Sequence, residues 1–206
     1  MKFIGITGGV GAGKSEILSY LAKKPDTKVM LADEIAHELM EPGTECYDAI
    51  CERFAGEDIF VEKAGTQFDR GKLARVIFAE EEKRDAMNGI VHPAVKKYVL
   101  KAAENARQEG KLTFLVLEAA LLIEEHYDEI CDELWYIYTR EPVREERLMA
   151  SRGYSREKVR QIFASQLPEE EYRRHCSVVI DNNGTVEDAC RQIDEELYKK
   201  TGRATK

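Results

Sequence analysis

Eight consecutive residues near the amino terminus set the strongest limit on how this chain can fold. They are Gly8, Gly9, Val10, Gly11, Ala12, Gly13, Lys14 and Ser15, and they match the pattern G-x-x-x-x-G-K-[ST] without a gap. An apolar stretch, residues 3–7, precedes them, and apolar side chains follow at helical spacing at Ile17, Leu18 and Leu21. The sequence therefore predicts a strand, a glycine-rich loop and a helix in direct succession.

The residue types in this loop predict that it binds phosphate. Glycines let the backbone curl so that N–H groups point inward at phosphate oxygens, and the positive end of the following helix adds to the attraction. We expect Lys14 to reach the outer phosphates, the Ser15 hydroxyl to hold Mg2+, and Glu16 to extend the nucleotide-binding segment. The alternative is an ordinary glycine-rich turn, which the strand, the helix and the Lys-Ser pair disfavour. The chain is thus predicted to bind a nucleoside triphosphate.

The bulk composition narrows the class of protein. A length of 206 residues with 43% hydrophobic and 34% charged residues suits one soluble domain with a small inserted subdomain. No apolar run is long enough to cross a membrane, and a cleavable signal is not expected because Met1 leads directly into a strand. The net charge of −8 and the pI near 5.2 argue against broad nucleic-acid binding. Nothing in the sequence indicates an oligomeric state.

The five cysteines form no C-x-x-C pair. Their odd number and their spacing disfavour both a zinc site and a disulfide framework. We therefore expect reduced thiols and a cytoplasmic protein.

Strand-like and helical segments alternate along the chain, which predicts an α/β fold with a parallel sheet. The five expected strands are residues 3–7, 28–31, 112–117, 134–138 and 177–180. Helices are expected at residues 142–150, 155–166 and 186–199. Between the second and third strands, residues 44–110 are predicted to form a helical insert broken only by a turn at Gly65, with Pro93 as the first residue of a helix that runs to Gln108. The expected parts are a core at 1–43 and 111–200, the insert at about 44–110, and a lid at about 141–167.

Asp33 directly follows the second expected strand. Ligands bind at the carboxyl ends of strands in open parallel sheets, and the glycine loop is expected at the same edge. The carboxylate of Asp33 is a candidate to accept a proton from a hydroxyl that attacks the terminal phosphate. Two alternatives remain open: it holds Mg2+ through water, or it is a helix N-cap.

The second half of the chain is rich in arginines, which makes residues 141–167 a candidate lid. Phosphoryl transfer needs cations around the moving phosphate, and Gly153 suits the turn between two helices of a mobile lid. The alternative is a set of solvated charges that pair with neighbouring glutamates. The arginines concerned are Arg140, Arg144, Arg147, Arg152, Arg156 and Arg160.

Other polar residues lie where strands or helices are expected to end. Glu118 ends a buried strand, which suggests a role at Mg2+ or substrate, whereas Glu124 is equally consistent with a solvated charge. His92 precedes Pro93 at an expected helix start, where capping or packing is the common role. Residues 181–184 read Asp-Asn-Asn-Gly, which indicates a turn or a loop that lines an adenine pocket.

Taken together, these residues resemble the dephospho-CoA kinase family over nearly the whole chain, from Phe3 to about Ile193. The resemblance rests on ordered motifs: residues 4–15, 32–33, 35–38, 42–43, Arg70, 76–78, 91–93, 121–124, Arg147, 152–153, 165–166 and 179–182. The sequence departs from the family pattern at Leu31, Glu16, Ala120 and Cys176-Ser177.

The resemblance implies a three-layer P-loop kinase fold with a five-stranded parallel sheet, a helical acceptor-binding insert and an arginine-rich lid. It implies transfer of the γ-phosphate of ATP, with Mg2+, to the ribose 3′-hydroxyl of dephospho-CoA. Asp33, Lys14 and Arg147 would be catalytic, and Arg147 and Arg152 would belong to the lid. Asn182 and Asn183 would join residues 8–16 in binding ATP. The acceptor side would comprise Thr7, Asp33, Arg70, His92 and Glu124.

Two other functions are compatible with the phosphate loop. One is a small-molecule P-loop kinase that acts on a nucleoside monophosphate or a sugar. The other is a GTP-dependent switch, since residues 181–184 match D-x-x-G. That motif comes late in the chain and no N-K-x-D follows it, so adenine is favoured over guanine.

Overall fold

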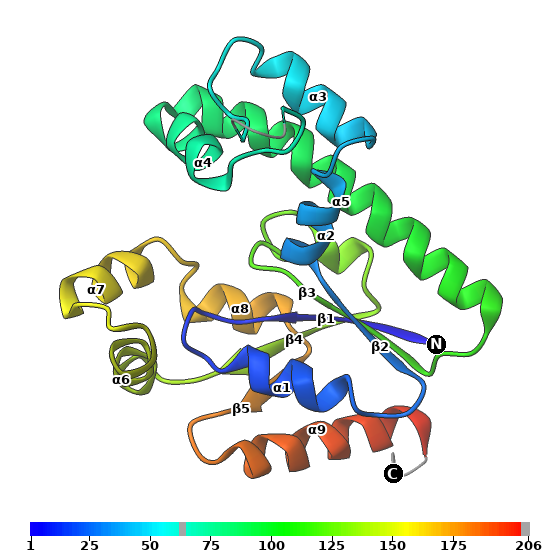
Figure 1. Ribbon diagram of the computed structural model, residues 1–206. Coiled ribbons are helices and arrows are strands. Elements are labelled where there is room, and N and C mark those ends of the chain that lie inside the picture. Colours follow the sequence, from blue (N-terminus) through cyan, green and yellow to red (C-terminus); the bar gives the residue numbers. More distant parts are fainter. Residues whose placement is uncertain (62–64, 203–206) are drawn as a thin grey trace. The chain divides into compact units, whose positions relative to one another are not determined.

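The computed structural model describes residues 1–61 and 65–202, and the chain forms two compact units (Figure 1). The first unit is Met1–Met30 with Asn105–Lys206, and the second is Leu31–Glu104. The second unit thus begins at Leu31, ahead of residue 44, where the sequence analysis placed the start of the insert.

A five-stranded sheet forms the centre of the first unit. Its strands are β1 (Lys2–Thr7), β2 (Thr27–Leu31), β3 (Phe114–Glu118), β4 (Glu133–Tyr138) and β5 (Val178–Asp181), in the order β2-β3-β1-β4-β5. The pairs β1–β3, β1–β4 and β4–β5 are parallel. Residues 114–117 of β3 are fully buried, as expected of a strand covered on both faces. The predicted α/β fold and its five strands are confirmed.

Helices cover both faces of this sheet (Figure 1). On α9 (Val186–Thr201), the Lys200 amine lies 5.7 Å from the centre of the Trp135 ring. On α8 (Glu169–His175), Tyr172 stacks on Tyr136 with ring centroids 4.8 Å apart. Trp135 and Tyr136 are consecutive in β4, so their side chains point to opposite faces of the sheet. The helices that contact them, α9 and α8, therefore lie on opposite faces. The structure therefore has three layers.

The helix α1 (Lys14–Leu21) packs beside α9, where the Tyr20 hydroxyl donates to an Asp194 carboxylate oxygen over 2.6 Å. Two further helices, α6 (Glu141–Arg152) and α7 (Arg156–Ala164), form the predicted helix–turn–helix. Gly153 ends α6 at a φ of 63°, and the Ser155 side chain caps α7 by accepting from the Lys158 N–H.

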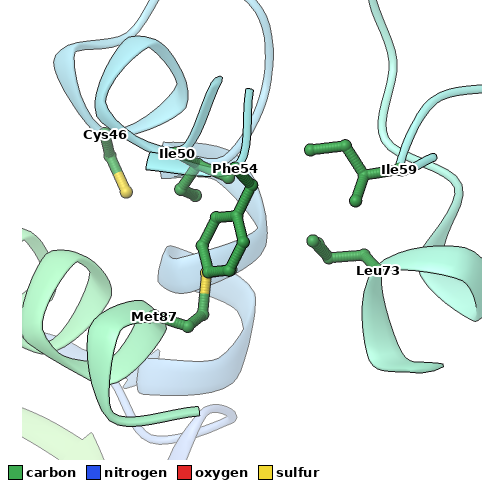
Figure 2. Close-up of a cluster of buried hydrophobic side chains, with 6 residues drawn as sticks. All are labelled: Cys46, Ile50, Phe54, Ile59, Leu73 and Met87. Carbon is green, nitrogen blue, oxygen red and sulfur yellow. The ribbon is translucent and has the colours of Figure 1, made fainter. Parts of the chain in front are cut away.

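The second unit is built from helices around a small apolar cluster. Its helices are α2 (Ala32–Leu39), α3 (Glu45–Arg53), α4 (Arg70–Ala79) and the first part of α5 (Glu81–Glu109). In Figure 2 the Phe54 ring and the Met87 side chain point toward one another, and Ile59 faces Leu73. The six buried members are Cys46, Ile50, Phe54, Ile59, Leu73 and Met87.

Two predictions for this region are wrong. The described residues between α3 and α4 are not helical; Phe60 and Phe68 form an antiparallel bridge and stack with ring centroids 5.5 Å apart. Pro93 does not begin a helix but lies inside α5. Met87, Val95, Val99 and Ala103 are buried along α5, so one apolar stripe at multiples of four residues runs past the proline. Packing of this stripe outweighs the local cost of the proline, about 3 kcal/mol.

Candidate active site

The glycine loop joins β1 to α1, as the sequence predicts. Gly13 is the N-cap of α1, has a φ of 85°, and provides no side-chain hydrogen bond to the first turn. The first N–H groups of α1 therefore lack a side-chain cap, which suits an anionic ligand. A Cβ atom at Gly13 would lie 2.5 Å from Asn182 Nδ2, so the position excludes a side chain as well as requiring a left-handed backbone.

Lys14 lies at the carboxyl edge of the sheet beside Glu118. Its Nζ donates to the Gly8 carbonyl over 2.7 Å and lies 3.6 Å from a Glu118 carboxylate oxygen. Glu118 is the last residue of β3 and pairs in register with Ile6 of β1. Ser15 and Glu16 are exposed in the first turn of α1. A cation and a carboxylate thus lie close together at the loop, and the next residue, Ser15, carries an exposed hydroxyl group.

Residues that directly follow β4 and β5 hydrogen-bond to a backbone carbonyl of the glycine loop. Asn182 Nδ2 donates to the Ala12 carbonyl over 2.7 Å, and the Thr139 hydroxyl lies within donating distance of the Ala12 and Asn182 carbonyls, at 3.1 and 3.2 Å. Thr139 and Asn182 are 2% and 3% exposed, so these bonds are shielded from water. Because the peptide group is planar and trans, a fixed Ala12 carbonyl directs the following Gly13 N–H to the opposite side.

Two arginines of α6 contact the same loop. Arg147 Nη2 donates to the Asn182 carbonyl over 3.0 Å, and its Nη1 lies 3.5 Å from the Ala12 carbonyl. Arg144 is buried, and its Nε donates to the Val10 carbonyl over 2.9 Å. Burial lowers the pKa of Arg144, while the nearby Tyr136 opposes that shift; burial also raises the pKa of Tyr136 to about 12. The predicted lid segment is therefore in contact with the phosphate loop.

Asn182 and Asn183 form part of the predicted turn after β5. The Asn183 N–H donates to Asp181 Oδ1 over 2.8 Å, which closes the turn, and Asn183 Oδ1 accepts from the Arg140 N–H over 2.9 Å. The side-chain amide of Asn182 is directed at the loop backbone. That geometry favours a supporting role for Asn182, and the predicted adenine contacts of both residues stay predictions.

Asp33 is the second residue of α2, which begins directly after β2. The N-cap of α2 is Leu31, in an extended conformation, so the capping alternative for Asp33 is wrong. Asp33 is exposed. The structure thus removes one of the three roles considered for this carboxylate.

The remaining predicted acceptor residues are dispersed in the sequence. Arg70 is the first residue of α4, which Asp69 caps, and His92 lies within α5 rather than at a helix start. With Asp33, they belong to the second unit, whereas Thr7 and Glu124 belong to the first. Thr7 is buried at the end of β1, and Glu124 is exposed in the turns after β3. Their assignment to one acceptor site stays a prediction.

Two contributors to the site were missed or not distinguished by sequence reasoning. Thr139 follows β4 directly, and the available signal was its position as a polar residue after a buried strand. Arg144 was one of six arginines, and nothing in the pattern separates it from the others. Both act through contacts with residues more than 120 positions away in the sequence.

Within residues 1–61 and 65–202, no helix combines the length and apolar character that crossing a lipid bilayer requires. The same residues contain no cluster of three or more histidine, cysteine, aspartate or glutamate side chains able to hold a metal ion on its own.

Known proteins resemble this chain over nearly its whole length. A family model described as dephospho-CoA kinase matches residues 2–188. A dephospho-CoA kinase of Enterococcus faecalis is 34% identical over 202 residues, covering 98% of each chain, and one of Geobacter sulfurreducens is 36% identical over 200 residues, covering 97% of this chain and 99% of the relative.

Solved structures show the same fold. A Thermus thermophilus structure has a TM-score of 0.76 at 29% identity and covers 98% of both chains. A shikimate kinase of Acinetobacter baumannii, at 15% identity and a TM-score of 0.51 over 98% of this chain and 96% of its own, shares the fold alone. The family model and the relatives together show that the chain belongs to the dephospho-CoA kinase family.

Proposed function

We propose that this chain transfers the γ-phosphoryl group of ATP to the ribose 3′-hydroxyl of dephospho-CoA and releases CoA and ADP. The proposal rests on the glycine loop, in which the Ala12 carbonyl accepts hydrogen bonds from Asn182 and Thr139. The dephospho-CoA kinase model matches the chain over residues 2–188. In the reaction, the acceptor oxygen forms a bond to the γ-phosphorus, and the bond from that phosphorus to the β–γ bridging oxygen breaks. The hydroxyl proton passes to a carboxylate.

Residues 8–16 would hold the triphosphate. Backbone N–H groups and the start of α1 offer hydrogen bonds to phosphate oxygens, and Lys14 supplies a positive charge beside the loop. These groups act on charge that develops as the phosphoryl group moves, so they stabilise the transition state as well as the bound nucleotide.

The loop also fits Mg2+. The exposed Ser15 hydroxyl and the Glu118 carboxylate, 3.6 Å from Lys14 Nζ, are oxygen groups of the kind that Mg2+ binds with phosphates and water. We infer that they hold the ion, directly or through water. Bound there, the ion would neutralise part of the phosphate charge.

Asp33 is the carboxylate proposed to accept the acceptor's proton. Support comes from its place directly after β2, from its exposure, and from the absence of the capping role that would otherwise explain it. Arg147 is proposed to steady the transferring group, because it already contacts Ala12 of the loop and the adjoining Asn182. Arg152, at the end of α6, would close the lid with it.

The acceptor side is proposed to include Thr7, Arg70, His92 and Glu124, and the adenine side Asn182 and Asn183. We propose a cytoplasmic location, because none of the five cysteines, all of which the structure describes, forms a disulfide. No nucleic-acid or membrane partner is proposed, in keeping with the net charge of −8.

An acceptor screen tests the proposal. ADP release from ATP would be followed with dephospho-CoA, with nucleoside monophosphates, with shikimate and with simple sugars, each at equal concentration. We expect turnover with dephospho-CoA to exceed every other acceptor by at least about 100-fold in kcat/KM, because a site that hydrogen-bonds its substrate rejects compounds lacking those groups. Preferred turnover of another acceptor would refute the assignment while leaving kinase chemistry intact.

A further inference from the structure

Arg144 is a buried cation pressed against the phosphate loop. It is 8% exposed, its Nε donates to the Val10 carbonyl over 2.9 Å, and its Nη2 donates to Gln166 Oε1 just beyond α7. Its guanidinium carbon lies 4.2 Å from the centre of the Phe163 ring on α7. One side chain therefore joins the loop, α6 and α7.

The guanidinium also occupies the space beside Gly9. A Cβ atom at Gly9 would clash with the Arg144 nitrogens, so glycine at this position permits the close approach. Because peptide groups are planar and trans, holding the Val10 carbonyl toward Arg144 turns the next N–H, that of Gly11, away from it. Arg144 thus fixes the orientation of one loop amide, as Asn182 and Thr139 fix that of Gly13.

Among the residues that the structure describes, this charge has no ion-pair partner. Within residues 1–61 and 65–202, Arg144 has no acidic side chain within the 4.0 Å distance of an ion pair. Glu141, one turn earlier in α6, acts on it only at longer range, and the neighbouring rings are those of Tyr136 and Tyr172. A buried charge without a counter-charge is costly, and it attracts an anion that comes close. The nearest anion that the proposed function brings is the polyphosphate of the nucleotide.

We propose that Arg144 is a positioning residue whose buried charge is balanced by the nucleotide's polyphosphate. Its planar, forked guanidinium group also shapes the phosphate loop by holding the Val10 carbonyl. The inference rests on the proposed ATP-dependent function, but it concerns nucleotide binding and not the acceptor. Arg144 would raise the affinity for every ligand that places phosphates in the loop and would leave acceptor recognition unaffected.

The test compares three variants of the full chain. R144M keeps most of the side-chain volume and removes the charge, and R144K keeps the charge and removes the fork. R173M is the matched control, because the Arg173 guanidinium also lies over a tyrosine ring, that of Tyr138 at 4.8 Å, but pairs with Glu169 at 2.6 Å. Binding of ATP and of inorganic tripolyphosphate would be measured by calorimetry, and acceptor binding separately.

We expect R144M to weaken ATP and tripolyphosphate by about tenfold each, which is about 1.4 kcal/mol, since both the charge and the hydrogen bond that orients Val10 are lost. R144K should lose about threefold, and R173M should stay within about twofold of the wild type. Acceptor binding should stay within twofold in all three. If R144M does not fold, the test uses R144K, and its loss of affinity for tripolyphosphate is compared with its loss of affinity for the acceptor. Equal losses for ATP and acceptor, or unchanged affinity for tripolyphosphate, would overturn the proposal. Loss of dephospho-CoA turnover alone, in the acceptor screen, would leave it standing.

Discussion

Replacing Gly13 by alanine separates the shape of the phosphate loop from the general cost of a left-handed residue. Gly13 has a φ of 85°, and the new methyl group would lie 2.5 Å from Asn182 Nδ2. Gly110 is the matched control, because it has a φ of 65° and a methyl group there would meet nothing within 4 Å. Each alanine lowers the free energy of unfolding by about 1–2 kcal/mol, because a residue with a Cβ atom is strained in the left-handed conformation.

G13A carries a second cost that G110A does not. The methyl group displaces Asn182, so the buried bond from Nδ2 to the Ala12 carbonyl is lost, and a buried polar group left unsatisfied costs about 1–3 kcal/mol. Urea unfolding should therefore place G13A about 1–3 kcal/mol below G110A in free energy of unfolding.

Nucleotide binding gives the second half of this test. Calorimetry should show that G13A weakens ATP by more than about tenfold, because the N-cap of α1 shifts, whereas G110A binds ATP as the wild type does. Equal stabilities for the two variants, together with ATP affinity within twofold in G13A, would refute the idea that Asn182 and Gly13 shape the loop jointly.

Four further outcomes follow from the same contacts. D33N should lower kcat by about 10²–10⁴-fold with the ATP dissociation constant within twofold, by steady-state kinetics and calorimetry; an unchanged kcat would remove Asp33 from the chemistry. K14A should lower kcat/KM for ATP by at least about 100-fold in the same assay, and a loss below tenfold would contradict its phosphate role. T139V removes the hydroxyl beside the Ala12 and Asn182 carbonyls, so urea unfolding should show about 1–2 kcal/mol of destabilisation, which wild-type stability would disprove. Burial raises the pKa of Cys131 to about 12, so at pH 8 its thiolate is scarce; mass spectrometry should show alkylation by iodoacetamide only in urea, and rapid labelling of folded protein would count against this.

The strands and the loop could be predicted because their signals are local. Continuous apolar runs mark β3 and β4, and the eight-residue motif carries its own strand and helix. By contrast α8 was not predicted, since its seven residues are almost all charged and only Tyr172 is buried. Pro93 led to a wrong prediction of where α5 begins, because packing of the long apolar stripe outweighs the preference of proline for a first helical position.

The site was predictable to the same depth. Lys14 and Ser15 belong to a contiguous sequence pattern, but the residues that support the loop lie far from it in the sequence. Asn182 reaches Ala12 across 170 positions and Arg144 reaches Val10 across 134, and no spacing rule links such pairs. Sequence reasoning therefore found candidate nucleotide-binding residues more readily than the residues that hydrogen-bond to their loop.

The hydrogen bonds that converge on Ala12 have a consequence for the order of events during synthesis. Every residue of the glycine motif has left the ribosome long before Thr139 and Asn182 exist, and without them the Ala12 carbonyl has no partner from β4 or β5. A nascent or truncated chain that ends before residue 182 would carry an intact motif without the Asn182 bond to Ala12, and we expect it to bind ATP more weakly. Tight nucleotide binding in this chain would therefore mark the completion of its sheet.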